Sequence, residues 1–173
     1  MPQAVPAAPP AGLCLAGTGS EYRKVVCELL DGAELFAGLA WAEINTLSGF
    51  VTAHEAEAGY ELFAEGAPGS ALYVLIRGGV ETRKEGESRQ VAVIATERAG
   101  KSIGEMALID GEPRSASCTV TEPSLLLCLT RENFHKLGEK HPALALHVTL
   151  RIARLMSRRL RATSGRLVEY LEG

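Results

Sequence analysis

The segment around residues 104–116 places a carboxylate and a guanidinium where both could contact one small ligand. Glu105 and Arg114 lie nine residues apart, around an apolar turn that begins at Gly104. The planar guanidinium of Arg114 can bond two phosphate oxygens at once. The Glu105 carboxylate only accepts hydrogen bonds, so it suits a sugar hydroxyl and would repel a phosphate. The pair is therefore predicted to hold the two ends of an anionic sugar phosphate.

The turn itself also favours an anion. Gly104 lets the backbone approach a ligand closely, and the Glu-Met-Ala-Leu sequence that follows predicts one short helical turn with free N–H groups. Two alternatives stay open on these residues alone. Glu105 and Arg114 could form a surface ion pair of little energetic value, or the domain could have kept this scaffold and lost its ligand.

The wider pattern, Gly-Glu-x-Ala-Leu followed by Arg-Ser-Ala, resembles the phosphate-binding cassette of the cyclic nucleotide-binding domain family. The resemblance extends through the segments 35–39, 59–66, 72–80, 132–134 and 141–142. It implies a mainly β fold: a jelly-roll β-barrel with flanking helices and one long C-terminal helix. It also implies a cyclic purine mononucleotide as ligand, with cAMP favoured over cGMP, and no cofactor.

The resemblance implies a set of ligand-binding residues in the cassette and in the C-terminal helix. These are Gly104, Glu105, Met106, Ala107, Arg114, Ser115, Ala116, Thr163 and Ser164. The backbone of Ala107 and the Ser115 side chain would assist Arg114 at the phosphate. Thr163 and Ser164 match residues of bacterial catabolite activators that reach the adenine amino group, the serine from the opposite subunit. The alternative is that both are small polar interruptions of a coiled-coil seam.

The elements that must position these residues follow from the hydrophobic periodicity. Residues 21–30 and 34–47 have apolar side chains three and four apart, which predicts amphipathic helices. Seven short runs of β-formers are cut by glycine and charged turns, as in a sandwich or barrel. They are 50–57, 61–64, 71–77, 80–84, 91–96, 115–121 and 124–130. Gly78-Gly79 predicts a two-residue hairpin, and residues 85–89 predict a second hairpin loop.

Thr130 is predicted to be an N-cap, and after it the pattern returns to helix. From Ala143 to Leu171 apolar and small residues follow a three-four repeat, which predicts a coiled-coil-like seam and a homodimer. Three parts are expected: a disordered or vector-derived segment 1–20, the barrel with its N-terminal helices at 21–140, and a lid and dimerisation helix at 141–173.

Composition narrows the class of protein. The net charge is −3, which argues against a chain that wraps nucleic acid, although residues 151–166 contain six arginines and no acid. That run is either a solvated helix face or a surface for an acidic partner. The four cysteines have no C-x-x-C spacing, and no window approaches a membrane span. We therefore expect reduced thiols and a cytoplasmic protein.

The sequence does not support an enzyme. A cupin-like metal site needs clustered histidines, but only His54 lies in the strand region. No serine or cysteine has a recognisable base nearby. We expect a cyclic nucleotide sensor or regulatory module whose downstream partner is unknown. The alternatives are a ligand-free interaction module or the sensory half of a DNA-binding regulator, although no helix-turn-helix follows the long helix in the sequence given and DNA binding by this chain is not expected.

Overall fold

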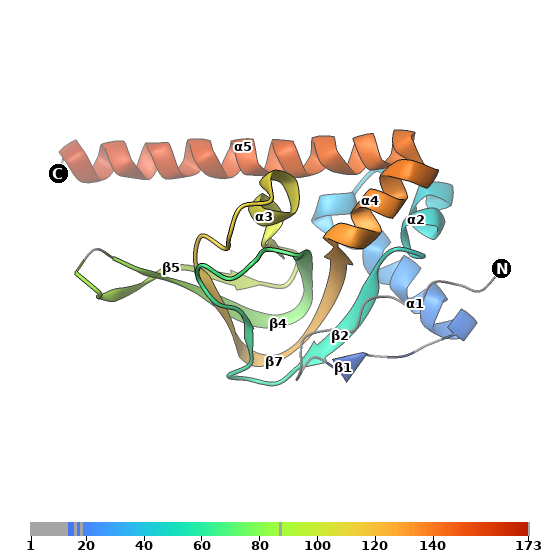
Figure 1. Ribbon diagram of the computed structural model, residues 1–173, viewed down its shortest axis with the longest axis horizontal. Coiled ribbons are helices and arrows are strands. Elements are labelled where there is room, and N and C mark those ends of the chain that lie inside the picture. Colours follow the sequence, from blue (N-terminus) through green and yellow to red (C-terminus); the bar gives the residue numbers. More distant parts are fainter. Residues whose placement is uncertain (1–13, 16, 18, 87, 173) are drawn as a thin grey trace.

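The computed structural model of the chain describes residues 14–15, 17, 19–86 and 88–172 (Figure 1). The helices are α1 (Gly19–Asp31), α2 (Trp41–Leu47), α3 (Glu105–Asp110), α4 (Arg131–Lys140) and α5 (Pro142–Glu172), with a 3₁₀ turn η1 (Glu34–Phe36). The strands are β1 (Cys14–Leu15), β2 (Thr52–Ala56), β3 (Glu61–Phe63), β4 (Ala71–Glu85), β5 (Val91–Arg98), β6 (Ser102–Ile103) and β7 (Ser117–Thr130).

The strands form one antiparallel sheet in the order β1-β2-β7-β4-β5, to which β3 adds on β7 and β6 adds on β4. In Figure 1 the sheet curls beneath α5, and α1, α2 and α4 pack at one end of it. This architecture confirms the predicted mainly β fold with flanking helices and a long C-terminal helix.

Both faces of the central strands are buried, because neighbouring side chains of a strand point to opposite faces. On β4, Leu72 and Val74 join the core shared with the helices, whereas Tyr73 and Leu75 join a second core on the other face of the sheet. The same alternation occurs on β7. The long strands that carry the site are therefore held from both sides.

The predicted hairpin at Gly78-Gly79 is wrong, because β4 runs through both glycines. A Cβ on Gly78, which has φ +92°, would lie 2.1 Å from Ser124 Oγ of β7. The pairing of β4 with β7 shifts register here, and Pro123 lies at the same irregularity, where a proline is tolerated. The glycines thus let two long strands bend together, and the runs at 115–121 and 124–130 likewise form one strand.

The helical segment predicted at 34–47 is divided in two. Gly38 has φ +80° and ends the short η1 turn, and α2 starts only at Trp41. The backbone N–H of Ala40 donates to Glu43 at 2.9 Å, which stabilises that start. The predicted N-cap of α4 is confirmed, since Thr130 Oγ1 accepts from Asn133 N at 3.1 Å.

The predicted segment 1–20 falls mostly outside the described residues. Within it, Cys14–Leu15 pairs with β2, and α1 begins at Gly19. At the other end α5 runs for 31 residues across the top of the sheet, with α3 between the two, as Figure 1 shows. None of the helices in the described part of the chain is long and apolar enough to cross a membrane.

Candidate cyclic nucleotide site

A cavity of about 380 Å³ lies between the β4–β5 part of the sheet, α3 and α5. It is lined by every cassette residue predicted from the sequence and by Thr163, but not by Ser164. The other lining residues were not predicted: Phe63, Thr82, Ile94, Ala95, Glu97, Ser102, Ile103, Arg159, Ala162 and Arg166. A cavity of this size and mixed character suits a small polar ligand.

Arg114 is buried at the cavity wall, with 5% of its surface exposed. Its Nη1 donates to the Gly104 carbonyl at 3.0 Å, and its Nη2 donates to the Ala71 carbonyl at 2.7 Å. The guanidinium lies 4.0 Å from the centre of the Phe63 ring, a cation–π contact. Burial lowers the pKa of Arg114 from its usual value, yet an arginine in a protein stays protonated.

The Arg114 charge is not neutralised by any carboxylate of the described residues, and its Nε has no hydrogen-bond partner there. A buried cation without a counter-ion is costly. The structure thus holds a rigid positive charge beside a cavity, which is the requirement for binding a fixed anion.

Gly104 is required by this geometry. Its φ of +79° is left-handed, and a Cβ there would lie 2.3 Å from Arg114 Nη1. A second close approach occurs at Gly69, where a Cβ would lie 2.0 Å from the Cβ of Ala107. The two glycines allow Arg114 and the loop before β4 to pack against the turn that begins α3.

Glu105 is also buried, at 5% exposure, and α5 provides its partner. Arg159 Nη1 donates to Glu105 Oε1, and Arg159 Nη2 donates to the Ser102 carbonyl at 2.7 Å. Glu105 Oε2 has no partner in the described part of the chain. One carboxylate oxygen is therefore occupied by Arg159, and the other is buried without a partner in the described residues.

The C-terminal helix closes the cavity with one face. Arg159, Thr163 and Arg166 lie four and three residues apart, so they share that face. Ser164 is exposed and lies outside the cavity of its own chain, so its predicted role in an opposite subunit stays a prediction. The helical spacing from Thr163 was the signal that could have identified Arg159 and Arg166 in the sequence.

No group of His, Cys, Asp and Glu side chains suited to a metal ion occurs among the described residues. His54 is buried on β2, where its Nε2 lies 2.7 Å from Thr52 Oγ1 and its Nδ1 has no partner. Burial lowers the pKa of His54, which favours a neutral ring. The part of the chain that the structure describes therefore contains no cluster of metal ligands of the kind that a cupin-like site needs.

Comparison with known proteins gives the family. Residues 53–141 match the family model of the cyclic nucleotide-binding domain. The chain belongs to the cyclic nucleotide-binding domain family. Its sequence is 33% identical over 135 residues to the cyclic AMP receptor protein of Thermus thermophilus, covering 76% of this chain and 59% of that protein.

Solved structures agree with this membership. A cyclic nucleotide-binding domain from Methylobacillus flagellatus has a TM-score of 0.80 and 30% identity, covering 92% of this chain and 89% of that chain. The regulatory domain of Toxoplasma gondii PKA, crystallised with cAMP, has a TM-score of 0.67 at 20% identity over 82% of this chain and 51% of that chain, and shows the fold alone. The chain spans about three fifths of the length of its curated relatives from Thermus thermophilus and Mycobacterium tuberculosis.

Proposed function

We propose that this cyclic nucleotide-binding domain is a cAMP sensor or regulatory module and not an enzyme. The observation that carries the proposal is the buried Arg114 guanidinium, which has no carboxylate partner in the described residues and lines a cavity of nucleotide size. A 3′,5′-cyclic phosphate carries one fixed negative charge, so it would pair with the Arg114 guanidinium.

The rest of the cavity fits the other parts of the ligand. Glu105 Oε2 is buried without a partner in the described residues, and we expect it to accept a hydrogen bond from the ribose 2′-hydroxyl. Phe63, Ile94 and Ala95 offer apolar surface, and Thr163 offers a hydroxyl to the base edge from α5. The Thermus thermophilus relative is named a cyclic AMP receptor protein, which favours adenine over guanine.

The site also suggests how binding would be transmitted. Arg159, Thr163 and Arg166 belong to α5, so a ligand that contacts them stabilises the position of α5 over the sheet. A ligand shifts a conformational equilibrium only through such differential contacts. We propose that α5 acts as a lid whose position is the output of the sensor.

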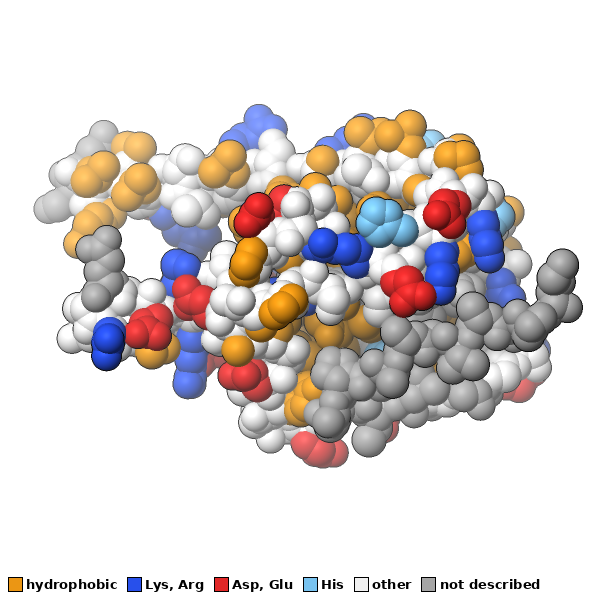
Figure 2. Space-filling view, viewed as in Figure 1, with side chains coloured by type: hydrophobic (Ala, Val, Ile, Leu, Met, Phe, Trp, Pro, Cys, Tyr) orange, Lys and Arg blue, Asp and Glu red, His pale blue; other side chains and the backbone are white. Residues whose placement is uncertain are grey.

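We further propose a parallel homodimer through α5. Leu150, Leu160 and Leu167 are 44%, 68% and 57% exposed, although they repeat along one stripe of the helix. Figure 2 shows hydrophobic side chains gathered at the C-terminal end of α5. Pairing two such stripes would bury them, and it would bring Ser164 of one subunit toward the cavity of the other.

A cytoplasmic location fits the state of the cysteines. Cys27, Cys118 and Cys128 are free and buried, and burial raises the pKa of the Cys118 and Cys128 thiols to about 11 and about 12. Such thiols stay protonated and unreactive at neutral pH. We therefore propose that the protein works in a reducing compartment.

A second candidate function, the sensory part of a longer transcription regulator, has one observation in its favour. The relatives named as a cyclic AMP receptor protein and as a transcriptional regulator are longer than the matched region. The ligand chemistry proposed here is the same in both cases, because the cavity lies wholly in the described chain.

Isothermal titration with cAMP, cGMP and 2′-deoxy-cAMP tests the proposal. We expect wild-type protein to prefer cAMP over its 2′-deoxy form by roughly tenfold, the value of one hydrogen bond to a charged group. Glu105→Ala should largely erase that preference, whereas Glu112→Ala, which removes an exposed acid of the same segment, should leave it unchanged. Wild-type protein that binds none of the three nucleotides would instead be a ligand-free interaction module.

A further inference from the structure

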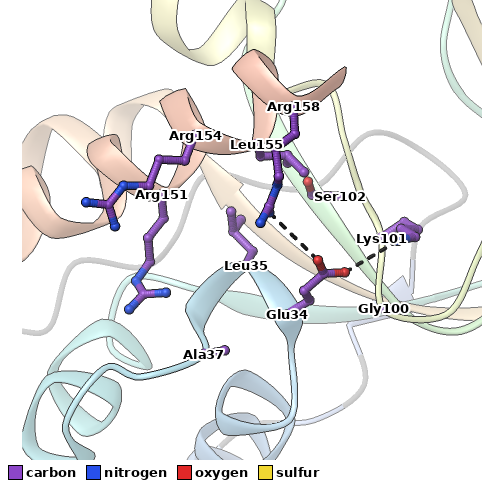
Figure 3. Close-up of a pocket in the computed structure, with 10 residues that line it drawn as sticks. All are labelled: Glu34, Leu35, Ala37, Gly100, Lys101, Ser102, Arg151, Arg154, Leu155 and Arg158. Carbon is purple, nitrogen blue, oxygen red and sulfur yellow. Dashed lines mark hydrogen bonds and ion pairs between the residues drawn. The ribbon is translucent and has the colours of Figure 1, made fainter. Parts of the chain in front are cut away.

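A second cavity, of about 290 Å³, lies along another part of α5. It shares only Ser102 with the lining of the 380 Å³ cavity described above, which we call the nucleotide cavity. Figure 3 shows its lining, which comes from η1 and the residue after it, the loop between β5 and β6, the first residue of β6, and α5. Four of its side chains are cationic and one is anionic, so it holds an excess of three positive charges in a protein of net charge −3. These side chains are Arg151, Arg154, Arg158, Lys101 and Glu34.

The three arginines form a row on one face of the helix, because they are three and four residues apart. Only Arg158 has an ion pair in the described part of the chain, to Glu34 at 3.7 Å, and Glu34 also pairs with Lys101 at 3.4 Å. Figure 3 shows Glu34 between these two cations. Glu43, the acid near Arg151, is occupied by His147 at 2.8 Å. Arg151 and Arg154 therefore have charges that no carboxylate of the described residues pairs with.

A second observation is a buried hydroxyl in the wall of this cavity. Ser102 lines this cavity and is 3% exposed, yet its Oγ has no hydrogen-bond partner in the described part of the chain. A buried hydroxyl without a partner is costly, and an oxygen-rich anion would satisfy it. The apolar part of the wall consists of Leu35, Ala37 and Leu155.

We infer that this cavity binds a small multivalent phosphate, such as a di- or triphosphate. The row from Arg151 to Arg158 spans about 10 Å of helix, a length that linked phosphates can follow and a single phosphate cannot. Exposed cations each bind weakly in water, and Glu34 opposes any anion, so several charges are needed on the ligand. A multivalent phosphate would displace Glu34 and join Lys101 to the α5 arginines.

This site would be coupled to the nucleotide cavity, an effect that rests on the proposed function. Arg158 lines the second cavity and the next residue, Arg159, lines the nucleotide cavity. Ser102 belongs to both linings, and its carbonyl accepts from Arg159 at 2.7 Å. A phosphate chain that joins α5 to the loop at Lys101 would hold α5 over the nucleotide cavity and so tighten cAMP binding.

Titration calorimetry with inorganic triphosphate at low salt tests the site directly, without cyclic nucleotide. We expect saturable binding that Arg151→Gln combined with Arg154→Gln weakens by roughly tenfold, as two lost exposed ion contacts would. Arg161→Gln is the matched control, because Arg161 is exposed on α5 and lines neither cavity. Arg114→Lys must also leave triphosphate binding unchanged, since loss of binding there would place the triphosphate in the nucleotide cavity.

The inference is overturned if wild type does not bind triphosphate, or if the double variant binds it as tightly as the Arg161→Gln control. Circular dichroism of each variant verifies folding. The coupling is measured separately, as a cAMP affinity about fivefold tighter with triphosphate present, with the reciprocal change in triphosphate affinity. A protein that binds triphosphate but no cyclic nucleotide would refute the proposed function and leave the second site standing.

Discussion

At the scale of single residues, Arg114 has a structural role in addition to its proposed role in phosphate binding. Its two terminal nitrogens hold the carbonyls of Gly104 and Ala71, so the side chain also fastens the start of α3 to β4. The sequence pattern predicted that Arg114 binds phosphate, but it did not indicate that Arg114 also attaches the start of α3 to β4. A change at Arg114 must therefore be judged by stability and binding together.

Arg114→Lys separates these two roles better than alanine does. Lysine keeps the positive charge but cannot bond both carbonyls in the planar geometry of a guanidinium. We expect the protein to fold with a lower melting temperature and to bind cAMP about 10- to 100-fold more weakly, the effect of one or two lost charge-assisted bonds. Calorimetry and a thermal melt measure the two effects. Arg161→Lys should change neither the melting temperature nor the cAMP affinity. An unaltered cAMP affinity in Arg114→Lys would show that Arg114 does not bind the phosphate.

At the scale of elements, the position of α3 depends on a close contact between Gly69 and Ala107. The Gly69 Cα faces Ala107 so closely that an added Cβ would clash with it at 2.0 Å. Neither glycine propensity nor the cassette pattern reveals this, because the contact joins the loop before β4 to a helix that follows some forty residues later.

Gly69→Ala should therefore displace α3 from its site. We expect a loss of about 1–3 kcal/mol in unfolding free energy, as for other overpacked sites, together with weaker cAMP binding. Gly138→Ala is the control, because Gly138 lies in α4 with nothing within 4 Å of an added Cβ. That substitution should stabilise the helix by up to about 1 kcal/mol without changing affinity. Denaturant unfolding measures the stability of the two variants, and calorimetry measures their cAMP affinity. Equal effects of the two substitutions would show that α3 can move to accommodate a side chain at residue 69.

The exposed stripe of α5 gives a second prediction at this scale. Leu160 is 68% exposed, so Leu160→Glu should cost little in the folded subunit but should place like charges together in a parallel dimer. We expect sedimentation to show a dimer for the wild type and a monomer for the variant, with similar melting profiles at low concentration. A wild-type monomer at high concentration, with and without cAMP, would eliminate both the dimer and the cross-subunit role of Ser164.

Sequence periodicity identified most elements, and it failed where glycines act between strands. Gly78-Gly79 satisfied the local rule for a hairpin, but the space that a side chain would need is filled by Ser124 of a strand some forty-five residues away. The cassette residues were predictable because they lie together in one short segment of the sequence, 104–116. For Arg159 the only signal in the sequence was its helical spacing from Thr163, because its partners Glu105 and Ser102 lie more than fifty residues earlier in the chain.

At the scale of the whole molecule, a buried histidine links stability to pH. His54 is 2% exposed, and burial lowers its pKa below the value of about 6.5 found in unfolded chains. The unfolded state then binds more protons between these two pKa values, so stability rises with pH there. The contribution is fully present above about pH 6.5 and is lost as the pH falls toward the folded pKa.

His54→Gln should flatten this part of the profile. We expect the difference in unfolding midpoint between pH 7.5 and 5.5, measured with urea, to be smaller in the variant than in the wild type. His135→Gln, which removes an exposed histidine of α4, is the control and should retain the wild-type difference. Identical pH profiles for wild type and His54→Gln would mean that the ring is already solvated in the native state.

The position of β7 in the sheet has a consequence for biosynthesis. β7 pairs with β2, β3 and β4, so it is the strand on which the sheet depends, and it is also the last strand to be translated. A nascent chain that ends before Ser117 can form the β4–β5 hairpin. However, β2 and β4 then lack β7, the strand that lies between them in the sheet. The sheet must therefore assemble late, after residues 117–130 have left the ribosome, and chains stalled earlier should be the ones that need chaperones.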